Sequence, residues 1–212
     1  MIVKVCGMRE PGNIRAVEQL GVDWMGFILW PHSPRRVERV PSYLPRCRRV
    51  GVFVNPADEE ILRWCELLGL DYIQLHGDES PVRCRQVHDL TGLPVIKALS
   101  VSRPRDAELA AAYHLSDGVS HLLFDTKSAV RGGSGEQFDW SLIQSYRGEL
   151  PFLLSGGIGP ADAPRVASLQ HPLMAGVDIN SRFESAPGLK DPGQVKTFIH
   201  QIRYEQNQQD IH

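Results

Sequence analysis

The sequence has no excess of basic residues. It contains 23 lysines and arginines against 25 aspartates and glutamates among 212 residues, which gives a formal net charge of −2. A protein that holds a nucleic-acid backbone normally carries a basic excess that neutralises phosphates. We therefore expect no nucleic-acid partner.

Cysteine is also scarce, and its spacing excludes the common cysteine-based sites. Cys6, Cys47, Cys65 and Cys84 form no C-x-x-C pair and have no histidine-rich tract beside them. Zinc sites and disulfide scaffolds depend on such clusters. We expect free thiols in a reducing cytoplasm, and no metal site.

Long hydrophobic runs are absent. No apolar segment approaches the roughly 20 residues that a membrane-spanning helix requires. The N-terminal stretch Met-Ile-Val-Lys-Val-Cys-Gly is too short and too soon interrupted for a signal peptide, and we expect no membrane association. The 42% of residues that are hydrophobic suffice for one substantial core rather than two small ones.

The chain repeats a unit of one short apolar segment followed by one helical segment. Most of the apolar segments are continuous rather than alternating, as in a parallel sheet that is buried on both faces. Their spacing leaves room for a helix between strands, which a hairpin would not need. The predicted strands are Ile2 to Cys6, Trp24 to Leu29, Arg49 to Val54, Tyr72 to His76, Pro94 to Leu99, His121 to Thr126, Pro151 to Ser155 and Met174 to Ile179.

Helical patterns between these strands complete eight βα units. The predicted helices include Asn13 to Gly21, Asp58 to Gly69, Ser80 to Leu90, Asp106 to His114, Ala161 to Leu169 and Asp191 to Arg203. We predict a single-domain α/β fold, a (β/α)8 TIM barrel with eight parallel strands over residues 1–203. Residues 204–212 form a polar tail that we expect to fray. A doubly wound open sheet is the competing architecture, since alternation alone does not reveal closure.

Candidate site residues lie where the predicted strands end, because barrels of this kind carry their active sites at the carboxyl ends of the strands. No trio follows a Ser-His-Asp logic, and the histidine and aspartates lack metal-site spacing. The candidates therefore indicate proton transfer by a thiol and a carboxyl group. They are Cys6, Asn55, His76, Asp125, Ser155, Gly156, Gly157, Asp178, Asn180 and Ser181.

Cys6 and Asp125 are the candidates with acid–base chemistry. Lys4 alternates with Cys6 along its strand, so both side chains point to one side, and a nearby cation favours a thiolate. A carboxyl group at the mouth of an apolar barrel has its pKa raised by desolvation and acts as an acid near neutrality. The plainer alternatives are a buried small hydrophobe for Cys6 and a loop cap for Asp125. The glycine-rich segment 127–137 follows the acid, and we expect it to close over a substrate.

Two further patterns are typical of anion binding. The seventh strand ends in Ser-Gly-Gly at residues 155–157 and the eighth in Asp-Ile-Asn-Ser at residues 178–181. The loops after these two strands commonly hold phosphate through backbone N–H groups. After the second strand, Arg35 offers a planar fork that suits a carboxylate. A tight turn and a solvated charge, respectively, are the structural alternatives.

Taken together, these stretches resemble the phosphoribosylanthranilate isomerase family of tryptophan biosynthesis. The similarity runs nearly from end to end of the chain. It rests on residues 4–8 (KVCGM), 33–35 (SPR), 50–55 (VGVFVN), 74–77 (QLHG), 124–125 (FD), 132–135 (GGSG), 138–140 (FDW), 155–157 (SGG), 176–178 (GVD), 187–188 (PG) and 190–191 (KD).

The resemblance implies an Amadori rearrangement of a small phosphosugar–anthranilate substrate. Asp125 then matches the family's general acid, which protonates the ring oxygen, and Cys6 its general base, which removes the C2′ proton. Arg35 matches the residue that holds the anthranilate carboxylate. The phosphate cradle corresponds to Gly156 and Gly157 with Asn180 and Ser181; His76 and Asp178 complete the predicted substrate site. No cofactor is expected, because the protonated imine is its own electron sink.

One departure from the family pattern concerns the phosphate site. Where Ser-Ser-Gly-Val-Glu is expected, the chain has Asn180-Ser181-Arg182-Phe183-Glu184, and we expect Arg182 to face solvent. Two other functions remain open. One is the sister isomerase of histidine biosynthesis. The resemblance implies a pair of aspartates in that enzyme, and this chain has Cys6 in place of one of them. The other is a catalytically silent phosphosugar-binding barrel. We expect a monomer or a weak homodimer.

Overall fold

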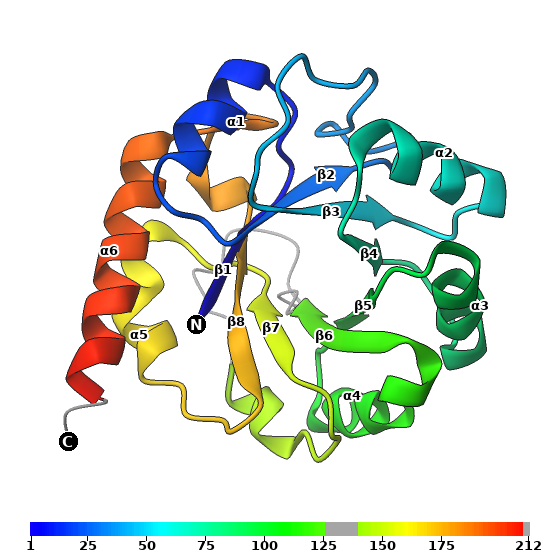
Figure 1. Ribbon diagram of the computed structural model, residues 1–212. Helices are drawn as coiled ribbons and strands as arrows, with labels where there is room; N and C mark the ends of the chain where they lie inside the picture. The colour runs from blue at the N-terminus through cyan, green and yellow to red at the C-terminus, as the bar shows by residue number, and fades with distance from the viewer. Residues whose placement is uncertain (126–139, 210–212) are drawn as a thin grey trace.

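The computed structural model describes residues 1–125 and 140–209. In this part of the chain, eight parallel strands close into a barrel with the helices outside it (Figure 1). The strands are β1 (Ile2–Val5), β2 (Trp24–Ile28), β3 (Arg48–Phe53), β4 (Tyr72–Leu75), β5 (Val95–Ser100), β6 (Val119–Asp125), β7 (Phe152–Ser155) and β8 (Met174–Ile179). The prediction of a TIM barrel is confirmed, and every strand begins and ends within two residues of its predicted limits.

The helices cover the outside of the barrel. They are α1 (Pro11–Glu18), α2 (Asp58–Leu68), α3 (Pro81–Thr91), α4 (Pro104–Leu109), α5 (Ala163–Ala167) and α6 (Pro192–Gln209), with short 3-10 turns η1 (Ala110–Ala112), η2 (Leu115–Asp117), η3 (Trp140–Ser145), η4 (Pro160–Asp162) and η5 (Ser181–Phe183). Several helices begin with proline, which lacks the N–H that a first turn cannot use. Gly69 and Gly92 end α2 and α3 in the left-handed conformation. No helix among the described residues is long and apolar enough to cross a bilayer.

Two predicted helices differ from the observed ones by more than three residues at one end. The segment predicted as Asp106 to His114 is an α-helix only to Leu109, and 3-10 turns follow it. Asp117 organises the last of these turns, because its carboxylate accepts hydrogen bonds from the His114 N–H and the Arg85 guanidinium. The last helix is longer than predicted. It continues through residues 204–209, where we predicted a frayed tail, because Glu and Gln are good helix formers and extend a helix that is already anchored.

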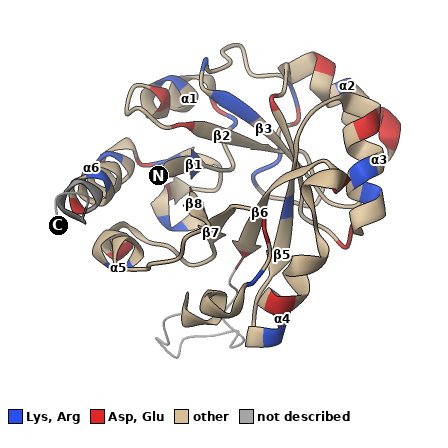
Figure 2. Cartoon of the chain, turned by 60° about the horizontal axis from the view of Figure 1, so that its bottom comes forward, with Lys and Arg blue, Asp and Glu red and all other residues tan. Residues whose placement is uncertain are grey.

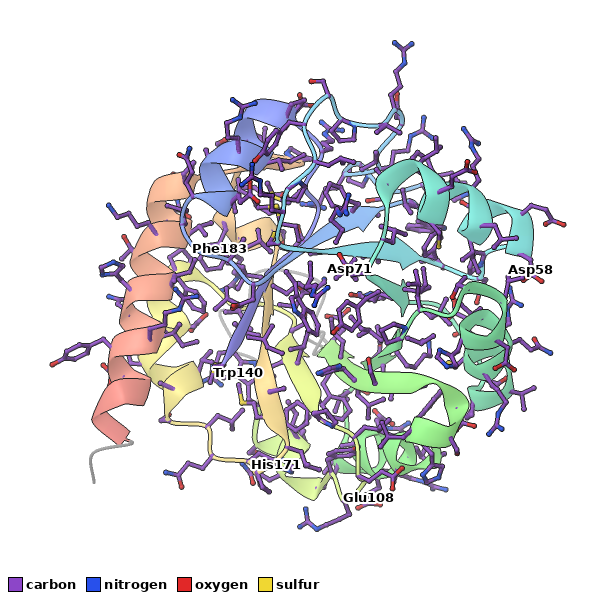
Figure 3. The ribbon with its side chains drawn as sticks, viewed as in Figure 1. Asp58, Asp71, Glu108, Trp140, His171 and Phe183 are labelled. Carbon is purple, nitrogen blue, oxygen red and sulfur yellow. The ribbon has the colours of Figure 1, made fainter. Side chains whose placement is uncertain are left out.

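Closure of the barrel depends on the pairing of the first and last strands. β1 and β8 pair in parallel, and their register places Lys4 opposite Asp178 and Val5 opposite Ile179. A small antiparallel hairpin, β9 (Glu184–Ala186) and β10 (Leu189–Lys190), follows β8. Phe183, labelled in Figure 3, lies just before this hairpin. Its ring packs edge-on against Phe198 of α6, with ring centroids 5.2 Å apart. This contact fixes the hairpin beside the barrel.

Apolar side chains form two cores. The larger one lies between the barrel and the helices, and the smaller one, which includes Cys6, fills the inside of the barrel. At the amino-terminal end of the interior, Trp24 stacks on Tyr72 with ring centroids 4.6 Å apart. Charged residues of both signs occur on the outer helices (Figure 2).

Candidate active site

Lys4 and Asp178 form a buried ion pair beside Cys6. The Lys4 side chain is fully buried, and its Nζ lies 2.9 Å from Asp178 Oδ1. Burial alone lowers the pKa of a lysine, but the attraction of Asp178 and Cys6 raises the pKa of Lys4 above its ordinary value. Lys4 is therefore a fixed cation, and the predicted position of Lys4 and Cys6 on one side of the strand is confirmed.

The Cys6 thiol does not have the low pKa that a neighbouring cation suggests. Burial raises the pKa of Cys6 above its ordinary value, and the opposing attraction of Lys4 offsets only part of the rise. Asp178 adds to the rise, whereas Lys190 acts against it. The folded protein thus holds Cys6 mainly as a thiol at neutral pH. Gly26 of β2 leaves it room, because a Cβ placed there would lie 2.7 Å from Cys6 Sγ.

Asp125 and His76 face each other across the carboxyl end of the barrel. Asp125 ends β6 and His76 follows β4, and His76 Nε2 lies 3.4 Å from Asp125 Oδ2. The other ring nitrogen, Nδ1, lies 2.9 Å from Gln74 Nε2. The two side chains are 15% and 30% exposed, respectively, for Asp125 and His76, so both reach solvent. A carboxyl group next to an imidazole in this position has the partners that proton transfer requires.

Arg35 is held by a carboxylate on the hairpin that follows the barrel. Its Nε donates to both oxygens of Glu184, and its NH2 lies 2.8 Å from Oε2. Lys190 also pairs with Glu184 and donates to Asn180 Oδ1 at 2.7 Å. Burial raises the pKa of Glu184, but hydrogen bonds from Arg35 and Lys190 outweigh it, and the net pKa is lowered. Glu184 is therefore ionised and keeps the Arg35 fork in one orientation.

The two loops predicted to bind phosphate follow β7 and β8. Gly156 and Gly157 have φ values of 84° and 68°, which a side chain would disfavour. Ser181 and Arg182 lie in η5 and are exposed. Arg182 nevertheless lies against the neighbouring loop, since a Cβ placed on Gly159 would be 3.3 Å from its Cδ.

The structure brings together most of the residues that the sequence singled out. Cys6 with Asp178 and Asp125 with His76 form two groups inside the barrel mouth. Arg35 and Asn180 are linked through Glu184 and Lys190. Asn55 has φ 46° and accepts a hydrogen bond from Asp78 N–H, which places it in the support of a loop. Segment 127–137 lies outside the described residues. Within the described part of the chain, no group of three His, Cys, Asp or Glu side chains is arranged to hold a metal ion.

Several site residues escaped the sequence analysis. Glu184 and Lys190 lie beyond the eighth strand, so a search of strand ends does not reach them. Gln74 lies before a strand end but alternates with His76, and that spacing places both side chains inside the barrel. The alternation with His76 could therefore have identified Gln74 from the sequence. Glu184 is recognised only by its contact with Arg35 in the folded protein.

A closed eight-stranded barrel with a thiol, two carboxyl groups and an arginine at the carboxyl ends of its strands defines a (β/α)8-barrel enzyme. A sequence model of the N-(5'-phosphoribosyl)anthranilate (PRA) isomerase family matches residues 3–201. The chain belongs to this family. It is an aldose–ketose isomerase of tryptophan biosynthesis.

Individual relatives agree with this assignment. The chain is 50% identical to an N-(5'-phosphoribosyl)anthranilate isomerase of Phocaeicola vulgatus, over 96% of this chain and 98% of the relative. Among solved structures, a phosphoribosyl anthranilate isomerase in complex with reduced 1-(o-carboxyphenylamino)-1-deoxyribulose 5-phosphate is 32% identical, with a TM-score of 0.77 over 96% of this chain and 100% of that chain. Monomers generated from the dimeric enzyme of Thermotoga maritima are 31% identical, with a TM-score of 0.76 over 96% of this chain and 99% of that chain.

Proposed function

We propose that Asp125 and Cys6 are the acid and the base of the rearrangement that this family performs, the conversion of N-(5-phosphoribosyl)anthranilate to 1-(2-carboxyphenylamino)-1-deoxyribulose 5-phosphate. Asp125 donates a proton to the furanose ring oxygen. The bond from that oxygen to C1′ breaks, and the nitrogen lone pair forms the C=N bond of a protonated imine. The observation that carries this proposal is the placement of Asp125, with His76, and Cys6, with Lys4, at the same end of one barrel.

The second half of the reaction needs a base. The Cys6 thiolate removes the C2′ proton, and the electrons of that C–H bond form a C1′–C2′ double bond while the imine nitrogen accepts the displaced pair. The resulting enolamine becomes the ketone when the C2′ hydroxyl loses its proton and C1′ gains one. Because the imine accepts the electrons, one acid and one base suffice and no cofactor enters the scheme.

The remaining site residues are proposed to hold the substrate. Arg35, oriented by Glu184, presents its remaining N–H groups to the anthranilate carboxylate. The backbone of Gly156 and Gly157 and the loop of Asn180 and Ser181 receive the phosphate. We propose that His76 and the second oxygen of Asp178, Oδ2, contact the ribose hydroxyls.

Turnover of phosphoribosylanthranilate tests these roles. The fluorescence of substrate generated in situ should decay with the wild-type protein, and the rate should fall by about 10²-fold or more in Cys6→Ser and in Asp125→Asn. Cys65→Ser and Asp58→Asn, both on α2, are matched controls that should retain the wild-type rate. If either site variant keeps that rate, its assigned role is wrong.

Two proposals concern the state of the protein in the cell. We propose a cytoplasmic enzyme, in agreement with four cysteines that are all free thiols.

We also propose a monomer or a weak homodimer. The dimeric Thermotoga maritima relative provides the precedent for association. Light scattering over a protein concentration series measures the state directly.

A further inference from the structure

Gln74 is a polar side chain in the interior of the barrel to which the acid–base scheme gives no task. It lies on β4, it is fully buried, and its Nε2 lies 2.9 Å from His76 Nδ1. Its carbonyl oxygen, Oε1, has no hydrogen-bond partner among the described residues. A buried amide that leaves one of its groups unpaired costs stability. Its contact with His76 is therefore the feature that needs an explanation.

We propose that Gln74 is a positioning residue that fixes the Nε2–H tautomer of His76, so that His76 donates a hydrogen bond to Asp125. The amide nitrogen of glutamine is a donor only, and a ring nitrogen that faces it must accept. Nδ1 therefore carries no hydrogen, and the neutral imidazole has its hydrogen on Nε2. That nitrogen faces Asp125 Oδ2 at 3.4 Å. The inference rests on the proposed role of Asp125 as the acid.

The opposite orientation of the amide leaves more N–H groups unpaired. In the structure, one N–H of Gln74 faces His76 Nδ1, and the carbonyl oxygen lies where no described residue offers a partner. With Oε1 toward His76, both N–H donors would be buried at that unpartnered position. Buried N–H groups without partners are rarer in proteins than under-satisfied carbonyl groups. The imidazole would then carry its hydrogen on Nδ1 and turn a bare Nε2 toward Asp125, where it could not donate to the carboxylate that forms when the acid gives up its proton. The orientation in the structure pairs one N–H of Gln74 and keeps a donor directed at Asp125.

The backbone around His76 leaves the ring orientation to Gln74. The His76 N–H donates to Phe53 O at 2.8 Å. On either side of His76, the carbonyl groups of Leu75 and Gly77 accept from Lys97 Nζ at 3.3 and 2.7 Å. Lys97 is itself paired with Glu79 at 2.8 Å inside the protein. The main chain of His76 is thus held on both sides, and the side-chain contact with Gln74 selects which nitrogen carries hydrogen.

A fixed donor at this position assists an acid. When Asp125 gives its proton to the ring oxygen, it becomes a carboxylate, and the His76 N–H is already directed at it. A donor that strengthens its bond as charge develops stabilises the transition state more than the ground state. Loss of the fixed tautomer should therefore lower kcat more than it changes KM.

Nitrogen-15 NMR of histidine-labelled protein tests the tautomer without reference to turnover. The His76 signals are assigned by their loss in His76→Gln. In the wild type we expect hydrogen on Nε2 and a bare Nδ1. Asp125→Ala should leave that tautomer in place, and Gln74→Met should give a mixture. An Nδ1–H tautomer or an imidazolium in the wild type, or a tautomer that changes in Asp125→Ala, would overturn the proposal.

Kinetics and a packing control complete the test. Gln74→Met should lower kcat by about 10-fold with KM changed less than about twofold, since one step of acid catalysis is weakened. Ile96→Val, which alters packing on the paired strand opposite Gln74, should change neither the tautomer nor kcat. An unchanged tautomer in a folded Gln74→Met would refute the role of Gln74. If Gln74→Met fails to fold, the wild-type and Asp125→Ala spectra still show which nitrogen of His76 carries hydrogen, and the proposal stands or falls on that result. Failure of the acid assignment appears separately, as wild-type turnover in Asp125→Asn.

Discussion

Cys6 lies among charges of both signs, and their balance sets its protonation. Burial is the largest influence on the pKa of Cys6 and raises it, while the positive charges of Lys4 and Lys190 lower this pKa. The ordinary thiol pKa is already above neutrality. The thiolate that removes the C2′ proton is therefore a minor species in the free enzyme, and its amount grows with pH.

The first prediction is a Cys6 thiolate whose amount rises with pH. We expect the ultraviolet absorbance of thiolate, taken as wild type minus Cys6→Ser, to increase from neutral into alkaline solution, because the thiolate fraction rises as the pH approaches the raised pKa of Cys6 from below. Lys190→Met should move the rising limb to higher pH, since it removes a cation that lowers this pKa. Lys196→Met on the exposed face of α6 should leave the profile unchanged. A profile that is flat from neutral to alkaline pH would contradict the account.

The second prediction concerns the space around Cys6. In Gly26→Ala, the new Cβ would lie 2.7 Å from Cys6 Sγ and 3.1 Å from its Cα, so the thiol must move. We expect kcat to fall by about 10-fold or more and stability to fall by about 1–3 kcal/mol, the range for an overpacked core. Gly12→Ala, with no atom near its Cβ, is the control. Steady-state kinetics and urea unfolding provide the measurements, and wild-type kcat in Gly26→Ala would refute the prediction.

At the scale of elements, the β4–α3 connection is tied to β5 by a buried ion pair. The Lys97 and Glu79 side chains are 1% and 2% exposed, and Glu79 also accepts hydrogen bonds from the Asn55 and Gly77 N–H groups. Burial raises the pKa of Glu79, but the hydrogen bonds and the attraction of Lys97 outweigh it, so the net pKa is lowered. The pair therefore holds the loop that carries His76.

The third prediction follows from this pair. Glu79→Gln should lower the free energy of unfolding by about 3–5 kcal/mol at neutral pH, because it leaves Lys97 buried without its counter-charge. A carboxyl group with a lowered folded-state pKa stabilises above its unfolded pKa, and this stability is lost as the pH falls through the folded value. The difference between wild type and variant should therefore shrink below a pH of about 4.

Urea unfolding at several pH values measures this effect. Glu59→Gln on the exposed first turn of α2 is the matched control and should change stability by less than about 1 kcal/mol. A difference between wild type and Glu79→Gln that stays constant into acid would mean that Glu79 does not titrate as a stabilising carboxylate.

At the scale of the whole molecule, α6 packs on the barrel through one face. Its buried residues are Val195, Phe198, Ile199 and Ile202. Arg203 donates to Gly21 O at 2.7 Å, and the following Tyr204 is 62% exposed. The helix therefore has its described anchoring contacts before residue 204, and we keep the prediction that residues 1–203 form the catalytic domain.

The fourth prediction is that a protein ending at Arg203 keeps its activity. Because the described anchors of α6 remain, we expect wild-type kcat and a Tm lower by no more than about 4 °C. A protein ending at Phe198, which lacks Ile199, Ile202 and Arg203, should be markedly destabilised. Thermal unfolding followed by circular dichroism distinguishes them. Loss of folding in the longer form would move the domain boundary into residues 204–212.

Short sequence patterns predicted most of the architecture and most of the side chains at the barrel mouth. Continuous apolar segments placed all eight strands, and strand ends pointed to Cys6, His76, Asp125 and Asp178 without any contact being known. The limits of helices were less predictable. The segment after Pro104 changed from α-helix to 3-10 turns, and Asp117 holds the last turn through Arg85, 32 residues earlier in the chain. Hydrophobic periodicity cannot predict such a long-range contact, because it depends only on residues that are close together in the sequence.

The sequence by itself determined the βα alternation, the free thiols and the residue types at the strand ends, because each depends on short segments. Only the tertiary structure decided how those residues act. Lys4 and Asp178 are 174 positions apart, and they meet because β1 closes on β8. The same closure buries Cys6, and that burial raises its pKa although a cation lies beside it. Desolvation depends on everything that surrounds a group, so the folded barrel, and not the neighbouring residues in the chain, sets the proton affinity of the base.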